Sequence, residues 1–167
     1  MPSLTWNDAL ANDLAPMDQT HREFVDCYNA VASAAPEDFL PAFDRLLEHT
    51  VAHFELENVW MAAVDFPGCH RGEHDRVLAV MRDIRKRVEK GDMFLGRRLI
   101  EELPAWFENH VNGMDAALAF HLNSIGFDFD KCALKPLAEG EARGAGCACA
   151  TLSGADEGCA STTSSAA

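Results

Sequence analysis

The segment from His49 to His74 reads His49-Thr-Val-Ala-His53-Phe-Glu-Leu-Glu57, passes a Pro67-Gly68 break, and ends with His70-Arg-Gly-Glu-His74. Residues four apart in an α-helix are separated by roughly 400° of rotation and about 6 Å of rise, so they project from one face. His53 and Glu57 form such a pair, and so do His70 and His74. Imidazole with carboxylate suits iron, zinc or copper, and carboxylates also bridge pairs of ions. The segment therefore predicts a metal site shared by two neighbouring helices.

The composition predicts one acidic domain. The chain has 167 residues with 27 Asp and Glu against 14 Lys and Arg, a formal net charge of -13. Such a balance argues against nucleic acid or an anionic membrane surface as a partner. No apolar run approaches the roughly 20 residues of a membrane span, and the first residues lack the pattern of a signal peptide. We therefore expect a cytoplasmic protein, with its six cysteines reduced.

Apolar residues recur at spacings of three and four along most of the chain, which predicts four helices. Their expected ranges are residues 18–34, with Asp18 as the N-cap, then 36–64, 70–90 and 93–124. Pro104 falls well inside the last range, where a proline removes an amide donor, so we expect a kink near Ile100. Gly126 is the expected C-cap.

The expected fold class is all-α. Four long helices joined by short turns predict an up-down-up-down four-helix bundle, an architecture that builds metal sites from facing side chains. Residues 1–17 are apolar but broken by proline, which predicts an ordered N-terminal arm. Residues 1–130 would form the domain. Residues 131–167 would form a tail that becomes rich in Ala, Gly, Ser and Thr from about residue 138, and we expect that part to be disordered.

The chain offers further ligands at the same end of the expected bundle. Because alternate helices run in opposite directions, His21 and His110 would reach the level of His53 and His70. Asp115 follows His110 by five residues, which rotates it about 140° around an ideal α-helix. That spacing suits a metal site if Asp115 bridges to a second ion, or if Gly113 relaxes the helix locally.

These motifs together resemble the hemerythrin family, specifically its prokaryotic hemerythrin-like group. The resemblance covers about residues 4–123. It is carried by the ordered set Met17-Asp-x-x-His21, His53-Phe-x-x-Glu57, His70-x-x-x-His74 and His110-x-x-x-x-Asp115. Each motif alone is weak, because His-x-x-x-Glu occurs by chance in many helices. The set of seven residues in this order is specific.

The resemblance implies a cofactor of two non-haem iron ions with a bridging oxo or hydroxo group. His70, His74 and His110 would hold one iron, His21 and His53 the other, and Glu57 and Asp115 would bridge them. One iron would then keep an open position for dioxygen. A lining of Leu103, Trp106 and Phe107, one and two turns before His110, is the expected oxygen pocket.

The predicted function is reversible dioxygen binding, as an oxygen carrier, store or delivery protein without catalytic residues. Five imidazoles and two carboxylates make a less anionic site than that of the carboxylate-rich di-iron oxidases, which favours binding over substrate oxidation. An oxygen or redox sensor and a di-iron peroxidase or oxidase remain alternatives.

Two departures from the family pattern stand near the expected site. Asn58 occupies a position where relatives often have a second acid, which should change the local charge but not the ligation. Pro104 lies close to the expected pocket. His49, one turn before His53, is either a hydrogen-bond donor behind the metal or an ordinary structural histidine. We also expect His121 to be structural or exposed.

Overall fold

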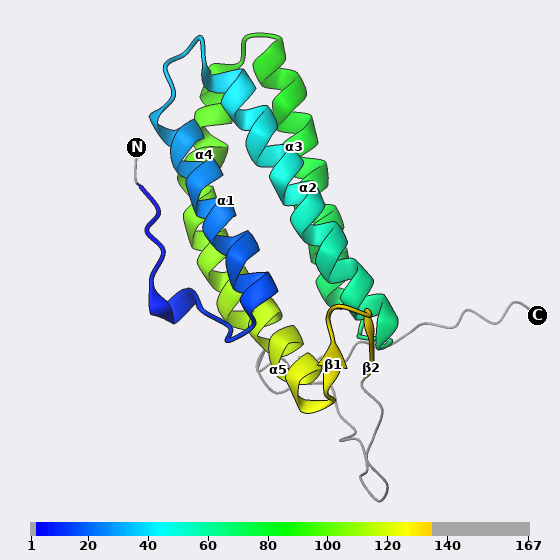
Figure 1. Ribbon diagram of the computed structural model, residues 1–167. Helices are drawn as coiled ribbons and strands as arrows, with labels where there is room; N and C mark the ends of the chain where they lie inside the picture. Colours follow the sequence, from blue (N-terminus) through cyan, green and yellow to red (C-terminus); the bar gives the residue numbers. More distant parts are fainter. Residues whose placement is uncertain (1–2, 135–167) are drawn as a thin grey trace, which may run out of the picture.

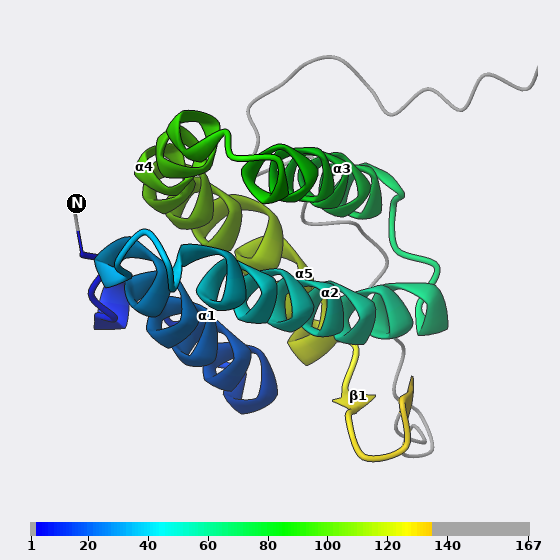
Figure 2. The same cartoon turned by 90° about the horizontal axis from the view of Figure 1, so that it is seen from above.

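The computed structural model describes residues 3–134, and its body is a four-helix bundle (Figure 1). The four long helices are α1 (Ala15–Ser33), α2 (Phe39–Ala63), α3 (Cys69–Glu89) and α4 (Met93–His110). Consecutive helices run in opposite directions and pack on each other, and α1 also contacts α4 (Figures 1 and 2). The predicted up-down-up-down bundle is confirmed.

The fourth predicted helix is divided near its middle. After α4 the chain makes a π-helical turn, η2 (Val111–Asp115), and then continues as α5 (Ala116–Ser124). Gly126 follows with a φ of +63°, the left-handed conformation that glycine adopts at helix ends without steric cost. The predicted range of residues 93–124 was therefore right in extent, but the prediction of a single α-helix was wrong at η2.

The N-terminal arm lies along the bundle and includes a short 3₁₀ turn, η1 (Asp8–Leu10). Leu4, Leu10 and Leu14 of the arm are buried. The predicted start of the first helix was wrong, because α1 begins at Ala15 and Asp18 lies inside it. The Asp18 carboxylate instead reaches back and accepts hydrogen bonds from the backbone amides of Asn12, at 2.8 Å, and Leu14, at 3.3 Å.

Pro104 lies inside α4, and the helix continues through it. A proline at this position cannot donate to the carbonyl of Ile100, four residues earlier. The hydroxyl of Tyr28 on α1 donates to that carbonyl instead, with an O···O distance of 2.9 Å. Both residues are fully buried, so an unpaired carbonyl here would be costly. The amide donor lost at Pro104 is thus replaced by a side chain from the neighbouring helix.

The apolar core consists of two clusters separated by a polar layer. One cluster fills the end of the bundle near the α1–α2 and α3–α4 turns and includes Phe39, Phe43 and Met81. The other lies toward the opposite end and includes Trp60 and Leu118. Along the chain, His21, Glu57 and Asp115 each fall between a residue of one cluster and a residue of the other. The polar groups are therefore closed off by apolar side chains on both sides.

The described part of the chain ends in a small antiparallel pair of strands, β1 (Phe127–Asp128) and β2 (Ala133–Leu134). Phe127 is buried and Phe129 packs edge-on against Trp60, so the segment covers one end of the bundle. These strands extend past the predicted domain end at residue 130. The tail that was expected to be disordered from about residue 138 lies outside the described residues. Within residues 3–134, no helix combines the length and apolar character that crossing a membrane requires.

Replacing Tyr28 with Phe should destabilise the protein by about 1–3 kcal/mol, because it leaves the buried Ile100 carbonyl without its donor. Urea unfolding of purified protein would measure the loss. In a Pro104→Ala background the new amide can bond Ile100, so Tyr28→Phe should then cost clearly less. An equal cost in both backgrounds would contradict the compensation between Tyr28 and Pro104.

Candidate metal centre

The seven predicted ligands come together in the layer between the two apolar clusters. The helix α1 contributes His21, α2 contributes His53 and Glu57, α3 contributes His70 and His74, and the α4–η2 segment contributes His110 and Asp115. All seven side chains are buried, and the most exposed residue of the set, His110, is only 5% accessible. Helical i, i+4 spacing on α2 and α3 thus places the side chains as the sequence indicates.

The seven residues form two groups that share both carboxylates. One group contains Glu57, His70, His74, His110 and Asp115, and the other contains His21, His53, Glu57 and Asp115. In each group, one ligand atom from every residue lies within 4.8 Å of those of all the others. Two adjacent ion-sized sites with shared carboxylates are the arrangement expected for a bridged pair of metal ions.

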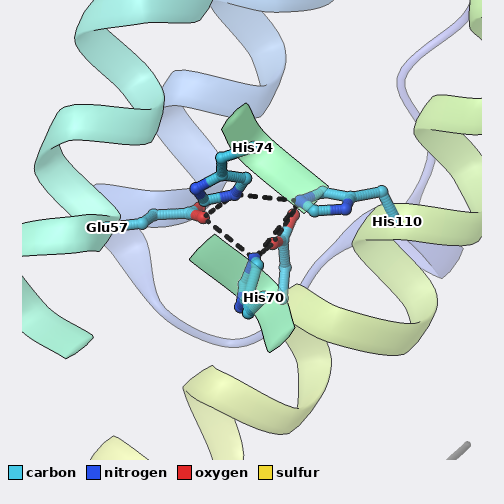
Figure 3. A group of neighbouring side chains, drawn as sticks. Glu57, His70, His74 and His110 are labelled. Atoms are coloured by element: carbon cyan, nitrogen blue, oxygen red, sulfur yellow. Dashed lines mark hydrogen bonds and ion pairs between the residues drawn. The ribbon is translucent and has the colours of Figure 1, made fainter. Parts of the chain in front are cut away.

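In the three-histidine group, the imidazole Nε2 atoms face one another (Figure 3). The Nε2 atom of His110 lies 3.3 Å from that of His70 and 3.2 Å from that of His74. Ligand nitrogens bound at about 2.1 Å and at right angles to each other would be about 3.0 Å apart. The spacing of these nitrogens therefore fits ligands of one cation better than a hydrogen-bond network, in which each pair needs one donor and one acceptor.

Each carboxylate turns one oxygen toward each group. Glu57 Oε2 lies 3.3 Å from Nε2 of His74, whereas its Oε1 lies 2.9 Å from Nε2 of His53. Asp115 Oδ1 lies 3.0 Å from Nε2 of His70, whereas its Oδ2 lies 3.0 Å from Nε2 of His21. Glu57 and Asp115 are thus placed to bridge two ions.

Several buried polar atoms in this layer have no hydrogen-bond partner among the described residues. Those that face the centre are Nε2 of His21, Oε2 of Glu57, and both carboxylate oxygens of Asp115. An unpaired buried polar atom costs about 1–3 kcal/mol, and more when it is charged. Bound cations would satisfy all four atoms, so the residues present fit a metal centre.

The electrostatics of the metal-free layer also favour cations. Burial and Asp115 raise the pKa of Glu57, but His53 and His74 more than offset this and leave it at about 2. Burial likewise opposes ionisation of Asp115, yet His110, His21 and His70 hold its pKa well below the usual value. Burial lowers the pKa of His74. Without metal, the surrounding imidazoles therefore supply the positive charge that keeps these two buried carboxylates ionised, a role that bound cations can take over.

The π-helical turn η2 explains the spacing of five between His110 and Asp115. In an α-helix this spacing would turn the two side chains about 140° apart, whereas the i→i+5 repeat of a π-helix returns them to one face. Nε2 of His110 accordingly lies 3.1 Å from Oδ1 of Asp115. A locally relaxed helix near Gly113 was one of the two expectations from the sequence, and η2 (Val111–Asp115) contains that glycine.

Asn58 orients one of the histidines. Its Oδ1 lies 3.1 Å from Nδ1 of His74. Because a carbonyl oxygen only accepts, Nδ1 of His74 carries the proton and Nε2 keeps its lone pair free for a metal. Phe54 stacks on the same imidazole, with ring centres 3.8 Å apart. The sequence marked Asn58 only as a charge difference, because nothing in a single chain showed that it would face His74 on α3.

The predicted oxygen-pocket residues lie on two different sides of the centre. Phe107 is buried and meets the ring of His21 edge-on, with centres 5.6 Å apart. Leu103 is buried one turn earlier on α4. Trp106 instead stacks on His110, at a centre separation of 4.8 Å. The indole is therefore placed against the three-histidine group, not beside His21.

Two histidines lie outside the cluster. Nε2 of His49 donates to the backbone carbonyl of Thr20 at 2.9 Å, which ties α2 to α1 one turn away from His53. His121 on α5 packs against Phe66. Of the two alternatives for His49, this contact supports an ordinary structural histidine over a hydrogen-bond donor behind the metal.

Comparison with known proteins agrees with this geometry. Residues 12–119 match the family model described as Hemerythrin HHE cation binding domain. The chain belongs to the hemerythrin family. It is 48% identical to the bacteriohemerythrin of Ralstonia nicotianae over 130 residues, which cover 77% of this chain and 95% of that protein. It is 28% identical to the bacteriohemerythrin of Stenotrophomonas maltophilia over 75% of this chain and 88% of that protein.

Membership of the hemerythrin family and the buried cluster support the same conclusion. The matched region contains all seven converging residues, and the domain that it matches is described as cation-binding. The chain is therefore a hemerythrin-family domain with a His/Glu/Asp cluster that is able to bind metal.

Asn58→Leu should weaken metal binding about 10–100-fold, because the proton on Nδ1 of His74 loses its acceptor. A competition titration against a chelator of known affinity would measure this. Asn58→Asp is the matched control, since it keeps an oxygen at this position and should retain tight binding. Equal affinity in wild-type protein and Asn58→Leu would contradict an orienting role for Asn58.

Proposed function

We propose that this hemerythrin binds two non-haem iron ions, bridged by an oxo or hydroxo group, and uses them to bind dioxygen reversibly. The observation that carries the proposal is the sharing of Glu57 and Asp115 between a three-histidine and a two-histidine group. When bound, the iron pair supplies two adjacent redox-active metal ions at which dioxygen can be taken up and released. The protein would serve as an oxygen carrier, store or delivery protein.

The two groups contain unequal numbers of histidines, which supports one open coordination position on the second iron. His70, His74 and His110 would hold the first iron, while only His21 and His53 would complete the second. Since both ions would share the two carboxylates and the bridge, the second has one protein ligand fewer. An incoming small molecule would therefore find its place on the His21 side.

Apolar side chains on that side would exclude water. Phe107 lies against His21, and Phe24 stacks on Phe107 with ring centres 4.4 Å apart. Both phenylalanines are buried, as is Leu103. A dry, apolar wall favours a neutral diatomic ligand over water and limits proton supply, which slows irreversible oxidation of the metal. We assign Phe107 and Leu103 to this wall.

The donor set favours binding over oxidation of a substrate. Five neutral imidazoles and two carboxylates bring less negative charge than the paired Glu and Glu-x-x-His motifs of di-iron carboxylate proteins. The two similar proteins are both named bacteriohemerythrin, and this name supports oxygen binding as the function. Oxygen sensing and peroxidase activity are the alternative main functions, and visible absorption spectra separate them from reversible binding.

The proposal is tested by visible absorption spectra of anaerobically reduced, iron-loaded protein, recorded before air, after air and after removal of air. A charge-transfer band that appears with oxygen and disappears on deoxygenation is expected. Irreversible conversion to an oxidised spectrum would favour redox sensing or peroxidase chemistry. The lack of any iron-dependent band would overturn the di-iron assignment.

His74→Ala should lose one iron equivalent or more, because it removes a proposed ligand from the three-histidine group. Elemental analysis of purified, iron-reconstituted protein gives the iron-to-protein ratio. His121→Ala is the matched control, since that histidine lies outside the cluster and packs on Phe66. Retention of two irons by the His74 variant would refute the ligand assignment.

A further inference from the structure

Trp106 connects the three-histidine group with the protein surface. Its indole stacks on His110 with ring centres 4.8 Å apart and planes inclined by 22°. The residue is only partly buried. It lines a pocket of about 150 Å³ together with His110, Asn109 and Met114. Through its stacked face the indole therefore contacts a proposed iron ligand, and through its edge it faces a surface pocket.

A carboxylate is hydrogen-bonded to the same indole. Nε1–H of Trp106 donates to Oε1 of Glu73 at 2.9 Å. Arg76 donates to both oxygens of Glu73, at 2.8 and 2.6 Å, and so fixes the carboxylate in place. A negative charge at hydrogen-bond distance stabilises positive charge on an aromatic ring, because the Coulomb energy is strong at short range and partial burial. Arg76 offsets part of this charge, but its side chain is 59% exposed and therefore more strongly screened by solvent than that of Glu73, which is 21% exposed. The Glu73 carboxylate thus favours loss of an electron from the indole of Trp106.

The chain contains two other tryptophans, and neither has this environment. The guanidinium of Arg22 lies over the ring of Trp6, 4.9 Å from its centre, and this positive charge opposes oxidation of that ring. The ring centre of Trp6 is also farther from a proposed ligand, at 6.4 Å from that of His21. Trp60 is buried at 2% exposure and packs on Phe129. Trp106 alone combines ligand contact, a carboxylate partner and access to the surface.

A second surface pocket gives small molecules access to the indole of Trp106. This pocket of about 200 Å³ contains Trp106 in its lining, with Val77, Val80 and Leu99 as apolar wall and Arg76 and Glu102 among its polar residues. Because the indole lines two surface pockets, it can exchange an electron with a donor that does not reach the buried metal layer.

We propose that Trp106 is a redox relay that passes single electrons from donors at the surface to the metal centre when the centre reacts with hydrogen peroxide. The proposal rests on the proposed di-iron function. It adds a protective side reaction, separate from reversible oxygen binding, by which peroxide that reaches the centre is reduced without oxidation of buried side chains. Trp106 acts through His110 and is a positioning and relay residue.

Reduction of one hydrogen peroxide to two water molecules breaks the O–O bond and consumes two electrons and two protons, the protons coming from solvent. An iron pair held by the two histidine groups would supply one of the two electrons, and Trp106 would supply the other through His110. The Nε1 proton stays in the hydrogen bond to Glu73. Two molecules of a one-electron donor, such as ascorbate, then reduce Trp106 and the centre and are themselves oxidised.

The test uses the full-length, iron-loaded, oxidised protein mixed with one equivalent of hydrogen peroxide and frozen within milliseconds. We expect an organic radical in the electron paramagnetic resonance spectrum, with narrowed hyperfine structure when the protein carries ring-deuterated tryptophan. Trp106→Phe keeps an aromatic ring on His110 and should lose the signal at unchanged iron content. Trp6→Phe is the matched control and should keep it.

Glu73→Gln is a second variant that keeps the hydrogen-bond acceptor and removes the charge. We expect its radical yield to fall several-fold at unchanged iron content. A full radical signal in Trp106→Phe would overturn the relay. So would the lack of a tryptophan radical in wild-type protein that contains two irons and shows the reversible oxygen band. Failure to load iron at all would instead refute the proposed function, and the relay with it.

Discussion

The buried pair of carboxylates is the constraint on which the rest of the structure depends. Glu57 and Asp115 are both fully inaccessible, and the surrounding histidines lower the pKa of each carboxyl group below its usual value. A protein interior tolerates such carboxylates only with nearby positive charge. Histidines from all four helices surround them, and each carboxylate faces both groups of imidazoles. The bundle can therefore close its two apolar clusters around this layer only if the layer is neutralised, and a pair of cations does so most directly.

That requirement accounts for the irregular parts of the fold. The turn η2 departs from α-helical geometry where His110 and Asp115 must point the same way. The N-terminal arm also contacts this turn, because the side-chain amide of Asn12 donates to the carbonyl of Val111 at 3.4 Å. The backbone amide of Asn12 is in turn held by Asp18 on α1. The arm thus braces the turn that presents a proposed bridging ligand, which gives a structural reason for its order.

How far the sequence predicts this fold depends on whether the interactions that determine each feature are local or join residues far apart in the chain. The pairs His53 with Glu57 and His70 with His74 are fixed by local helical geometry, so their convergence was predictable. The chain's order of motifs also led to the family, which the comparison confirms. Asp18 was predicted as an N-cap, but its carboxylate caps the preceding turn from inside the helix. Local preference alone could not distinguish these two uses of one aspartate.

Long-range contacts explain the remaining differences. The sequence showed that Pro104 removes a donor, but not that Tyr28, 72 residues away from Ile100 in the chain, would replace it. Likewise, Leu103, Trp106 and Phe107 were predicted to line one pocket because they lie one and two turns before His110, yet neighbouring side chains point in different directions around a helix. Phe107 consequently meets His21, while Trp106 meets His110 and Glu73.

This separation gives the two sides of the centre different chemistry. The His21 side is closed by the stacked rings of Phe24 and Phe107. These apolar rings suit a neutral gas. The His110 side presents an indole, a carboxylate and a guanidinium next to two surface pockets, which suits the movement of electrons. If the centre binds dioxygen as proposed, keeping these routes apart protects the metal from irreversible oxidation. An electron supplied near His110 can restore the metal without admitting water beside His21.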